Sequence, residues 1–166
     1  ILKSYRILSQ VVNELHLDIS FYEVGNVKTR RIWAPPFKIT RHIAADSLNS
    51  SMPYFIEFKG GAAKITDVNE KVYTPNLKEP DLPTEGLPFD IKMVEGIDPI
   101  FYEGITYKMV LNPLKSTVLS LAQDLQVLST SKDSEILSLT LESESMDLNE
   151  AILNTLIEKF NQDGVL

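Results

Sequence analysis

The sequence predicts an α+β fold, in which a mixed sheet is packed by N- and C-terminal helices and carries an all-β insertion. Apolar residues recur with helical spacing near both ends of the chain. Between these ends, residues 50–113 show only short β-like runs separated by turn residues. We therefore assign residues 1–49 together with 114–166 to a discontinuous α/β core, and residues 50–113 to the insertion.

The N-terminal segment predicts a helix followed by a hairpin. Ser4 is a favourable N-cap, and the apolar stripe behind it ends near His16. Residues 19–24 and 27–33 have the composition of strands, and the Gly-Asn pair at 25–26 between them is typical of a two-residue hairpin turn. The chain therefore opens with one amphipathic helix and two antiparallel strands.

Shorter elements follow between turn residues and prolines. We expect strands at 37–40, 54–58, 63–68, 71–74, 89–94 and 105–111, a short helix around 118–125 and a strand at 126–129.

The C-terminal segment 135–164 has the clearest pattern. Leucines alternate with polar residues over 137–141, which predicts a strand with one buried face. Asp147 stands three residues before Glu150, the spacing of a capping box, so we expect a helix to begin at about Asp147. Apolar residues then recur with helical period, and Gly164 supplies the stop.

Composition and charge limit the functions that the chain can have. The net charge is −7, which argues against a general nucleic-acid-binding protein, and the absence of cysteine excludes disulfides and thiolate zinc sites. The charge is uneven: residues 1–49 carry +3, residues 50–115 carry −3 and residues 116–166 carry −7. No run approaches the roughly 20 apolar residues of a membrane span, but a chain that begins with Ile1 is expected to be a piece of a longer protein.

Catalytic motifs are absent from the sequence. It has no phosphate-binding loop, no GxSxG and no HExxH. His42, Asp46 and Ser47 are close in sequence, but closeness in sequence does not make a catalytic triad. The run 67–70 favours a hairpin turn over a calcium loop, because it lacks the later Gly and Glu. We therefore predict no catalytic, metal or cofactor-binding residues in this chain.

The two ends of the sequence resemble a known protein family. Residues 2–17, 19–29 and 36–39 resemble the start of the periplasmic domain of Wzz-type chain-length determinants, particularly those joined to tyrosine autokinases in Bacteroides-like bacteria. Residues 134–141 and 147–160 are similar to the second signature of that family, a strand followed by a helix with the pattern A-x-x-x-N-x-L-x-x-x-[YF]. The match is slightly shifted and falls on Ala151, Leu153, Asn154, Leu156, Ile157 and Phe160.

The resemblance implies a non-catalytic domain on the periplasmic face of the bacterial inner membrane, held between two membrane helices. Such domains form homo-oligomers and set the chain length of capsule, exopolysaccharide or O-antigen (lipopolysaccharide) made by a partner polymerase and its export machinery. In the autokinase subclass a cytoplasmic kinase domain follows the second membrane helix, and no residue of it is present here. The sequence departs from the family by lacking both membrane helices and a long helix after the second signature, and by carrying the β insertion.

The charge asymmetry suggests an interface for such an oligomer. A ring needs two different complementary faces on each subunit, and a basic N-terminal part could meet an acidic C-terminal part. The alternative is that these charges are solvated or paired within one subunit. The predicted interface residues are Arg30, Arg31 and Arg41 on one side and Glu142, Glu144, Asp147 and Glu150 on the other.

Two other classes of function are open at this point. A saccharide-binding or adhesin-like surface module would suit the β insertion, with aromatic side chains forming a stacking platform. A hydrolase would need two carboxylates facing each other across a cleft. The aromatic residues considered for the platform are Trp33, Tyr54, Tyr73, Phe101, Tyr102 and Tyr107.

Overall fold

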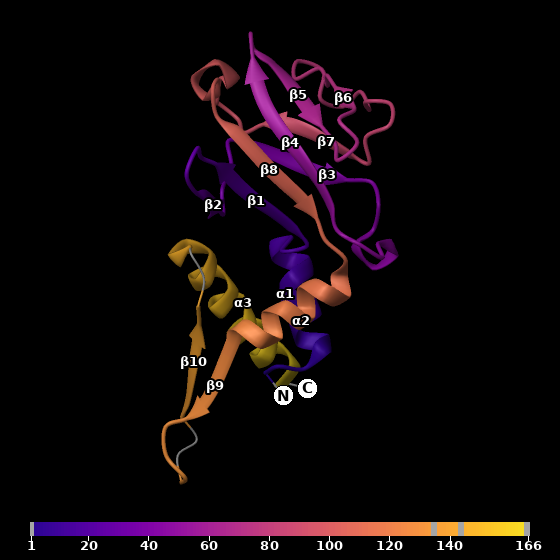
Figure 1. Cartoon of the computed structure of the whole chain (residues 1–166). Coiled ribbons are helices and arrows are strands. Elements are labelled where there is room, and N and C mark those ends of the chain that lie inside the picture. The colour runs from indigo at the N-terminus through magenta and orange to yellow at the C-terminus, as the bar shows by residue number, and fades with distance from the viewer. Residues whose placement is uncertain (1, 134–135, 143–144, 165–166) are drawn as a thin grey trace. The chain divides into compact units, whose positions relative to one another are not determined.

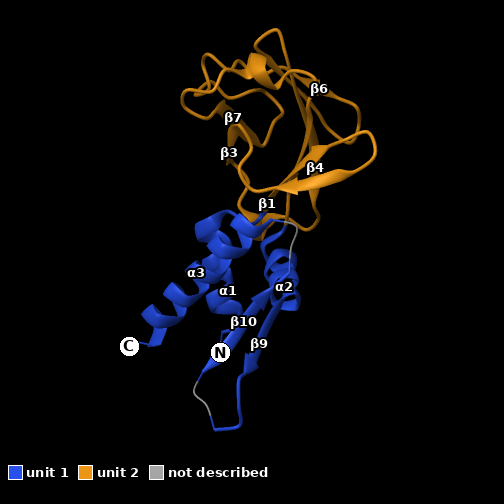
Figure 2. Ribbon diagram, turned by 90° about the vertical axis from the view of Figure 1, so that its left-hand side faces the viewer, with its two compact units in different colours: residues 1–18, 113–166 blue, residues 19–112 orange. Residues whose placement is uncertain are grey.

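The computed structural model describes residues 2–133, 136–142 and 145–164 and confirms an α+β fold. The chain divides into two compact units (Figure 2). Unit 1 combines residues 1–18 with 113–166, and unit 2 comprises residues 19–112.

Unit 1 contains three α-helices and a two-stranded hairpin. Its elements are α1 (Tyr5–Leu15), α2 (Leu114–Asp124), β9 (Leu125–Ser129), β10 (Leu137–Leu141) and α3 (Met146–Gly164). Helix α1 packs against both α2 and α3, and the antiparallel hairpin β9–β10 extends away from the helices (Figure 1). Within the described residues, no helix is both long enough and apolar enough to cross a membrane.

Helix α1 forms as the sequence predicts. The Ser4 hydroxyl oxygen accepts a hydrogen bond from the N–H of Ile7 at 3.3 Å, which satisfies one of the free donors of the first turn. His16 ends the helix in the left-handed conformation with φ 52°, and the N–H of Leu17 returns to the carbonyl of Val12. The stripe Ile7, Leu8, Val11 and Val12 is fully buried.

The second signature segment also forms a strand and a helix, with two corrections. The helix begins at Met146 instead of Asp147, because the Ser145 hydroxyl accepts a hydrogen bond from the N–H of Leu148 at 3.3 Å and caps the earlier turn. Strand β10 does not have a fully buried face: Leu137 is 49% exposed and Leu139 is half-buried. A two-stranded sheet has too few neighbours to bury a whole face.

Unit 2 is built from strands and two short 3₁₀ helices. A six-stranded antiparallel sheet has the order β2-β1-β8-β4-β5-β6, and β3 pairs with β7 in a separate antiparallel ladder. The elements are β1 (Ile19–Val24), β2 (Thr29–Ile32), β3 (Phe37–Arg41), η1 (Ala45–Ser47), β4 (Met52–Lys59), β5 (Ala62–Thr66), β6 (Val72–Tyr73), β7 (Phe89–Met93), η2 (Pro99–Tyr102) and β8 (Thr106–Leu111).

The core of unit 2 lies between the six-stranded sheet and the β3–β7 ladder. The Phe37 ring of β3 lies 5.3 Å from the Tyr107 ring of β8 and 5.8 Å from the Phe58 ring of β4. The Phe89 ring of β7 contacts the Tyr54 ring edge-on at 4.9 Å. One face of the large sheet is therefore the inner face of a two-layer core, and its other face points away from that core.

The structure corrects the expected boundary of the insertion. Strand β8 pairs with β1 on one side and with β4 on the other, so the strands before residue 50 belong to the same sheet as those after it. The boundaries of the units fall at 18/19 and 112/113, and not at 49/50. The segment that interrupts the helical unit is thus residues 19–112.

The predicted two-residue turn of the first hairpin is also wrong. Val24 pairs with Thr29, which leaves a four-residue connection closed by the N–H of Gly25 donating to the carbonyl of Lys28 at 3.0 Å. A Cβ on Gly25 would lie 2.6 Å from that carbonyl oxygen, so the close approach requires glycine.

Candidate functional site

The face of the six-stranded sheet that points away from the core gathers charged and aromatic side chains. We call it the outer face, and define it by the strand positions that alternate with the buried ones. It carries four cations and a single carboxylate, although the chain as a whole is acidic. Its charged and aromatic residues are Tyr22, Arg31, Phe55, Glu57, Lys59, Lys64 and Lys108.

The strand register aligns four of these residues across neighbouring strands. Arg31 of β2 is opposite Tyr22 of β1, which is opposite Lys108 of β8, which in turn is opposite Phe55 of β4. The Lys108 ammonium lies 5.9 Å from the centre of the Tyr22 ring, at the limit of a cation–π contact, and Phe55 is 38% exposed. We call this line of residues the central row.

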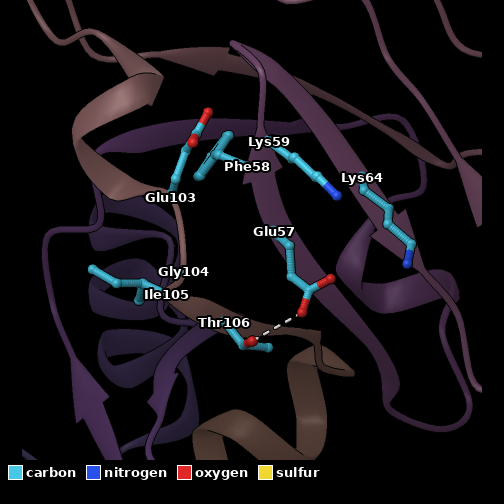
Figure 3. A pocket seen from close by; sticks show the side chains of 8 residues that line it. All are labelled: Glu57, Phe58, Lys59, Lys64, Glu103, Gly104, Ile105 and Thr106. Carbon is cyan, nitrogen blue, oxygen red and sulfur yellow. Dashed lines mark hydrogen bonds between the residues drawn. The ribbon is translucent and has the colours of Figure 1, made fainter.

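An open pocket of about 430 Å³ adjoins the outer face near the β4–β5 hairpin (Figure 3). The Glu57 carboxylate accepts a hydrogen bond from the Thr106 hydroxyl at 3.0 Å, and the Glu103 carboxylate accepts one from the N–H of Gly60 at 2.6 Å. The pocket is lined by Glu57, Phe58, Lys59, Lys64, Glu103, Gly104, Ile105 and Thr106.

The two carboxylates of this pocket do not face each other. Figure 3 shows the Glu57 carboxylate directed toward Thr106 and the Glu103 carboxylate turned the other way. A glycosidase pair would have to flank a common bond. The pocket therefore offers separate acceptors and ammonium donors for hydrogen bonds, an arrangement suited to binding polar groups.

The predicted interface residues lie in both units. Arg30 of β2 donates to the Glu23 carboxylate at 3.1 Å within the same hairpin, and the Arg41 Nε donates to the carbonyl of Ile43 at 2.6 Å. Arg31 is half-buried on β2. The Arg30 pair matches the alternative that these charges are paired within one subunit.

The acidic half of the predicted interface lies in unit 1. Asp147 and Glu150 are exposed in the first turns of α3, and Glu142 is exposed just after β10. Glu144 lies outside the described residues. The structure thus places Asp147 and Glu150 on one helix. The interface between a basic and an acidic face of neighbouring subunits stays a prediction.

The six aromatic residues considered for saccharide stacking do not form one platform. Tyr54, Tyr73 and Tyr107 are at most 9% exposed and belong to the core. Phe101 is 81% exposed on η2, whereas Trp33 and Tyr102 are half-buried. Burial raises the pKa of Tyr107 to about 12, and the Glu23 carboxylate adds to this effect.

The polar groups that resembled other motifs have structural roles. His42 Nε2 lies 3.1 Å from the Asp90 carboxylate, and its neighbours Asp46 and Ser47 lie in η1. The Asp67 carboxylate accepts hydrogen bonds from two backbone N–H groups of its own turn at 2.8 and 3.0 Å, as expected for a hairpin turn. Among the described residues, no group of three or more His, Asp or Glu is placed to hold a metal ion.

The helix pair α1–α3 joins the two ends of the chain. The Arg6 guanidinium pairs with the Asp163 carboxylate, and the Lys159 ammonium pairs with the Glu14 carboxylate. The buried stripe of α1 and the buried Leu148, Ile152 and Leu156 of α3 belong to the same unit, and α1 packs against α3. The beginning of α1 and the end of α3 therefore lie side by side in unit 1.

Sequence reasoning missed the central row. The alternation within each strand indicates which residues point outward, but the row depends on β8 lying between β1 and β4, and no local pattern carries that pairing. Comparison with protein-family models and with curated proteins finds no match to this chain.

Proposed function

We propose that this chain is the extracytoplasmic, non-catalytic part of a membrane-anchored regulator of polysaccharide chain length, of the Wzz type. The domain would assemble into a homo-oligomer in its parent protein and act on the polymerase and export machinery for capsule, exopolysaccharide or O-antigen. In the autokinase subclass it would be the sensory part of a tyrosine kinase whose catalytic domain lies outside this chain.

The single observation that supports the proposal best is the packing of α1 against α3. The two segments that carry the resemblance come from opposite ends of the chain, with 130 residues between α1 and α3, yet these two helices share one unit. The Arg6–Asp163 ion pair places the beginning of the first helix beside the end of the last. This arrangement suits a domain held between two membrane helices, because both connections must lead back to the same membrane.

The proposal is tested by the length of the polysaccharide in the host bacterium. Deleting the parent gene should change the length distribution of a surface polysaccharide on gels, and the wild-type gene should restore it. The variant Leu156→Asp should fail to restore it, because it places an unpaired charge in the fully buried α1–α3 core. The matched control Ile157→Asp, on a side chain that is 44% exposed, should restore the wild-type distribution.

Two outcomes would contradict this function. An unchanged distribution after deletion would show that the parent protein does not regulate chain length. Full restoration by Leu156→Asp, at a wild-type protein level, would show that the α1–α3 unit is not required for regulation.

A further inference from the structure

The outer face of the six-stranded sheet concentrates positive charge in an acidic protein. Arg31, Lys59, Lys64 and Lys108 share this face with the single carboxylate Glu57, whereas the chain has a net charge of −7. The Glu57 carboxylate accepts a hydrogen bond from the Thr106 hydroxyl. A face with this excess of cations attracts a negatively charged ligand.

Aromatic side chains alternate with the cations on this face. Tyr22 and Phe55 lie on either side of Lys108 in the central row, and Arg31 continues the row beyond Tyr22. Because neighbouring strands are about 4.8 Å apart, the two rings stand roughly 10 Å apart with an ammonium between them. The spacing between neighbouring residues of the central row is about the width of one pyranose ring, so the aromatic rings and cations can contact successive sugars of a chain.

We propose that the outer face binds a linear acidic polysaccharide that carries carboxylate groups, such as a uronic-acid polymer. The apolar faces of its sugars would stack on Tyr22 and Phe55, and its carboxylates would pair with Lys108 and the neighbouring cations. Hydroxyl groups would reach the polar pocket beside Glu57 and Thr106. The proposal rests on the proposed function, in that it names the polymer class that the domain would contact.

Single-stranded nucleic acid could also use a row of rings and cations. The structure favours the polysaccharide because the cations alternate with aromatic rings and a carboxylate instead of forming a continuous basic groove. Both polymers are negatively charged and both are repelled by the net charge of −7, so the alternation of rings and cations is what favours the polysaccharide.

The experiment measures binding of alginate oligosaccharides to the whole 166-residue chain by calorimetry. Dextran oligosaccharides serve as the neutral probe and oligodeoxythymidylate as the nucleic-acid probe. We expect alginate to bind with an affinity that falls as salt is raised, and we expect dextran and the oligonucleotide to bind at least about tenfold more weakly.

Matched variants locate the site. Lys64→Gln with Lys108→Gln should weaken alginate binding about tenfold, since it removes two cations from the outer face. Lys38→Gln with Lys92→Gln removes the same charge from exposed positions of the β3–β7 ladder and should change the affinity by less than about twofold.

An aromatic pair of variants adds a test that does not depend on charge. Phe55→Ala should weaken alginate binding about tenfold, because the ring offers a stacking surface. Phe101→Ala, on a ring that is 81% exposed on η2 and is not part of the central row, should have little effect. Unchanged melting curves will show that each variant is folded.

Several results would overturn the proposal. These are no measurable alginate binding, equal binding of dextran, tighter binding of the oligonucleotide, or equal losses in the test and control variants. None of these results bears on the gene-deletion experiment, so the glycan site can fail while chain-length regulation stands. The converse also holds, because alginate binding can be found in a protein whose deletion leaves chain length unchanged.

Discussion

Truncating Leu156 should destabilise unit 1 without affecting unit 2. This side chain is completely buried on α3. Leu156→Ala removes three carbon groups, worth about 0.8 kcal/mol each in transfer from water, and leaves a cavity that raises the total loss to about 3 kcal/mol, within a range of 2–5 kcal/mol. With a urea dependence of roughly 1–2 kcal/mol per molar for a unit of this size, the unfolding midpoint should fall by about 1.5–3 M.

Two optical probes separate the units in this assay. The three α-helices that the structure describes all belong to unit 1, so far-UV circular dichroism at the helical minimum follows that unit. The single tryptophan, Trp33, belongs to unit 2, so its fluorescence follows the β unit. We expect Leu156→Ala to lower the midpoint of the helical signal and to leave the midpoint of the fluorescence unchanged.

The neighbouring Ile157 provides the matched control, because it is 44% exposed. Ile157→Ala should shift the helical midpoint by less than about 0.5 M, since exposed substitutions cost little. An unchanged helical midpoint in Leu156→Ala would refute the α1–α3 core. An equal shift of both signals would refute the separation into two units.

Three further perturbations test other parts of the fold. Gly25→Ala should cost about 1–3 kcal/mol in the fluorescence-monitored transition, because its Cβ would meet the Lys28 carbonyl oxygen at 2.6 Å. The control Val27→Ala, at a fully exposed position, should cost almost nothing, and equal losses in the two variants would contradict the turn geometry. Burial raises the pKa of Tyr107 to about 12, above its usual 10.0, so the folded state holds this proton more tightly than the unfolded state. The stability of unit 2 should therefore be unaffected by the ionisation of Tyr107 below pH 10 and fall by about 1.4 kcal/mol per pH unit between pH 10 and 12. A flat fluorescence-monitored stability between pH 10 and 12 would contradict this burial. Leu137→Ala should lower the free energy of unfolding of unit 1, followed by the helical signal, by less than about 1 kcal/mol, because the side chain is half exposed. A loss as large as that of Leu156→Ala would mean that Leu137 is buried against another part of the protein.

Elements whose signals are local could be predicted from the sequence. Helix α1 has its cap, its apolar stripe and its stop within residues 4–16, and it was predicted almost to the residue. The start of α3 was missed by one residue because two good caps compete there. Ser145 caps the helix through the N–H of Leu148, so Asp147 lies inside the first turn.

Features that depend on pairing between distant strands could not be predicted. The boundary of unit 2 follows from β8 lying between β1 and β4, although residues 24 and 106 are far apart in the chain. The central row follows from the same pairing, since Tyr22, Phe55 and Lys108 come from three different strands. Alternation identifies the outward side of each strand, but only the register shows which outward residues are neighbours.

The most direct test of the α1–α3 packing is the distance between the beginning of α1 and the end of α3 in the purified 166-residue chain. This chain has no cysteine, so Arg6→Cys with Asp163→Cys introduces one unique pair into it at the α1–α3 ion pair. A short bismaleimide should link the two residues within one subunit, while Arg6→Cys with Glu150→Cys should not react, because position 150 lies about 20 Å further along α3. Efficient linking of the first pair alone is the predicted result. Equal linking of both pairs, or no linking of the first, would contradict the joining of the chain ends through α1 and α3.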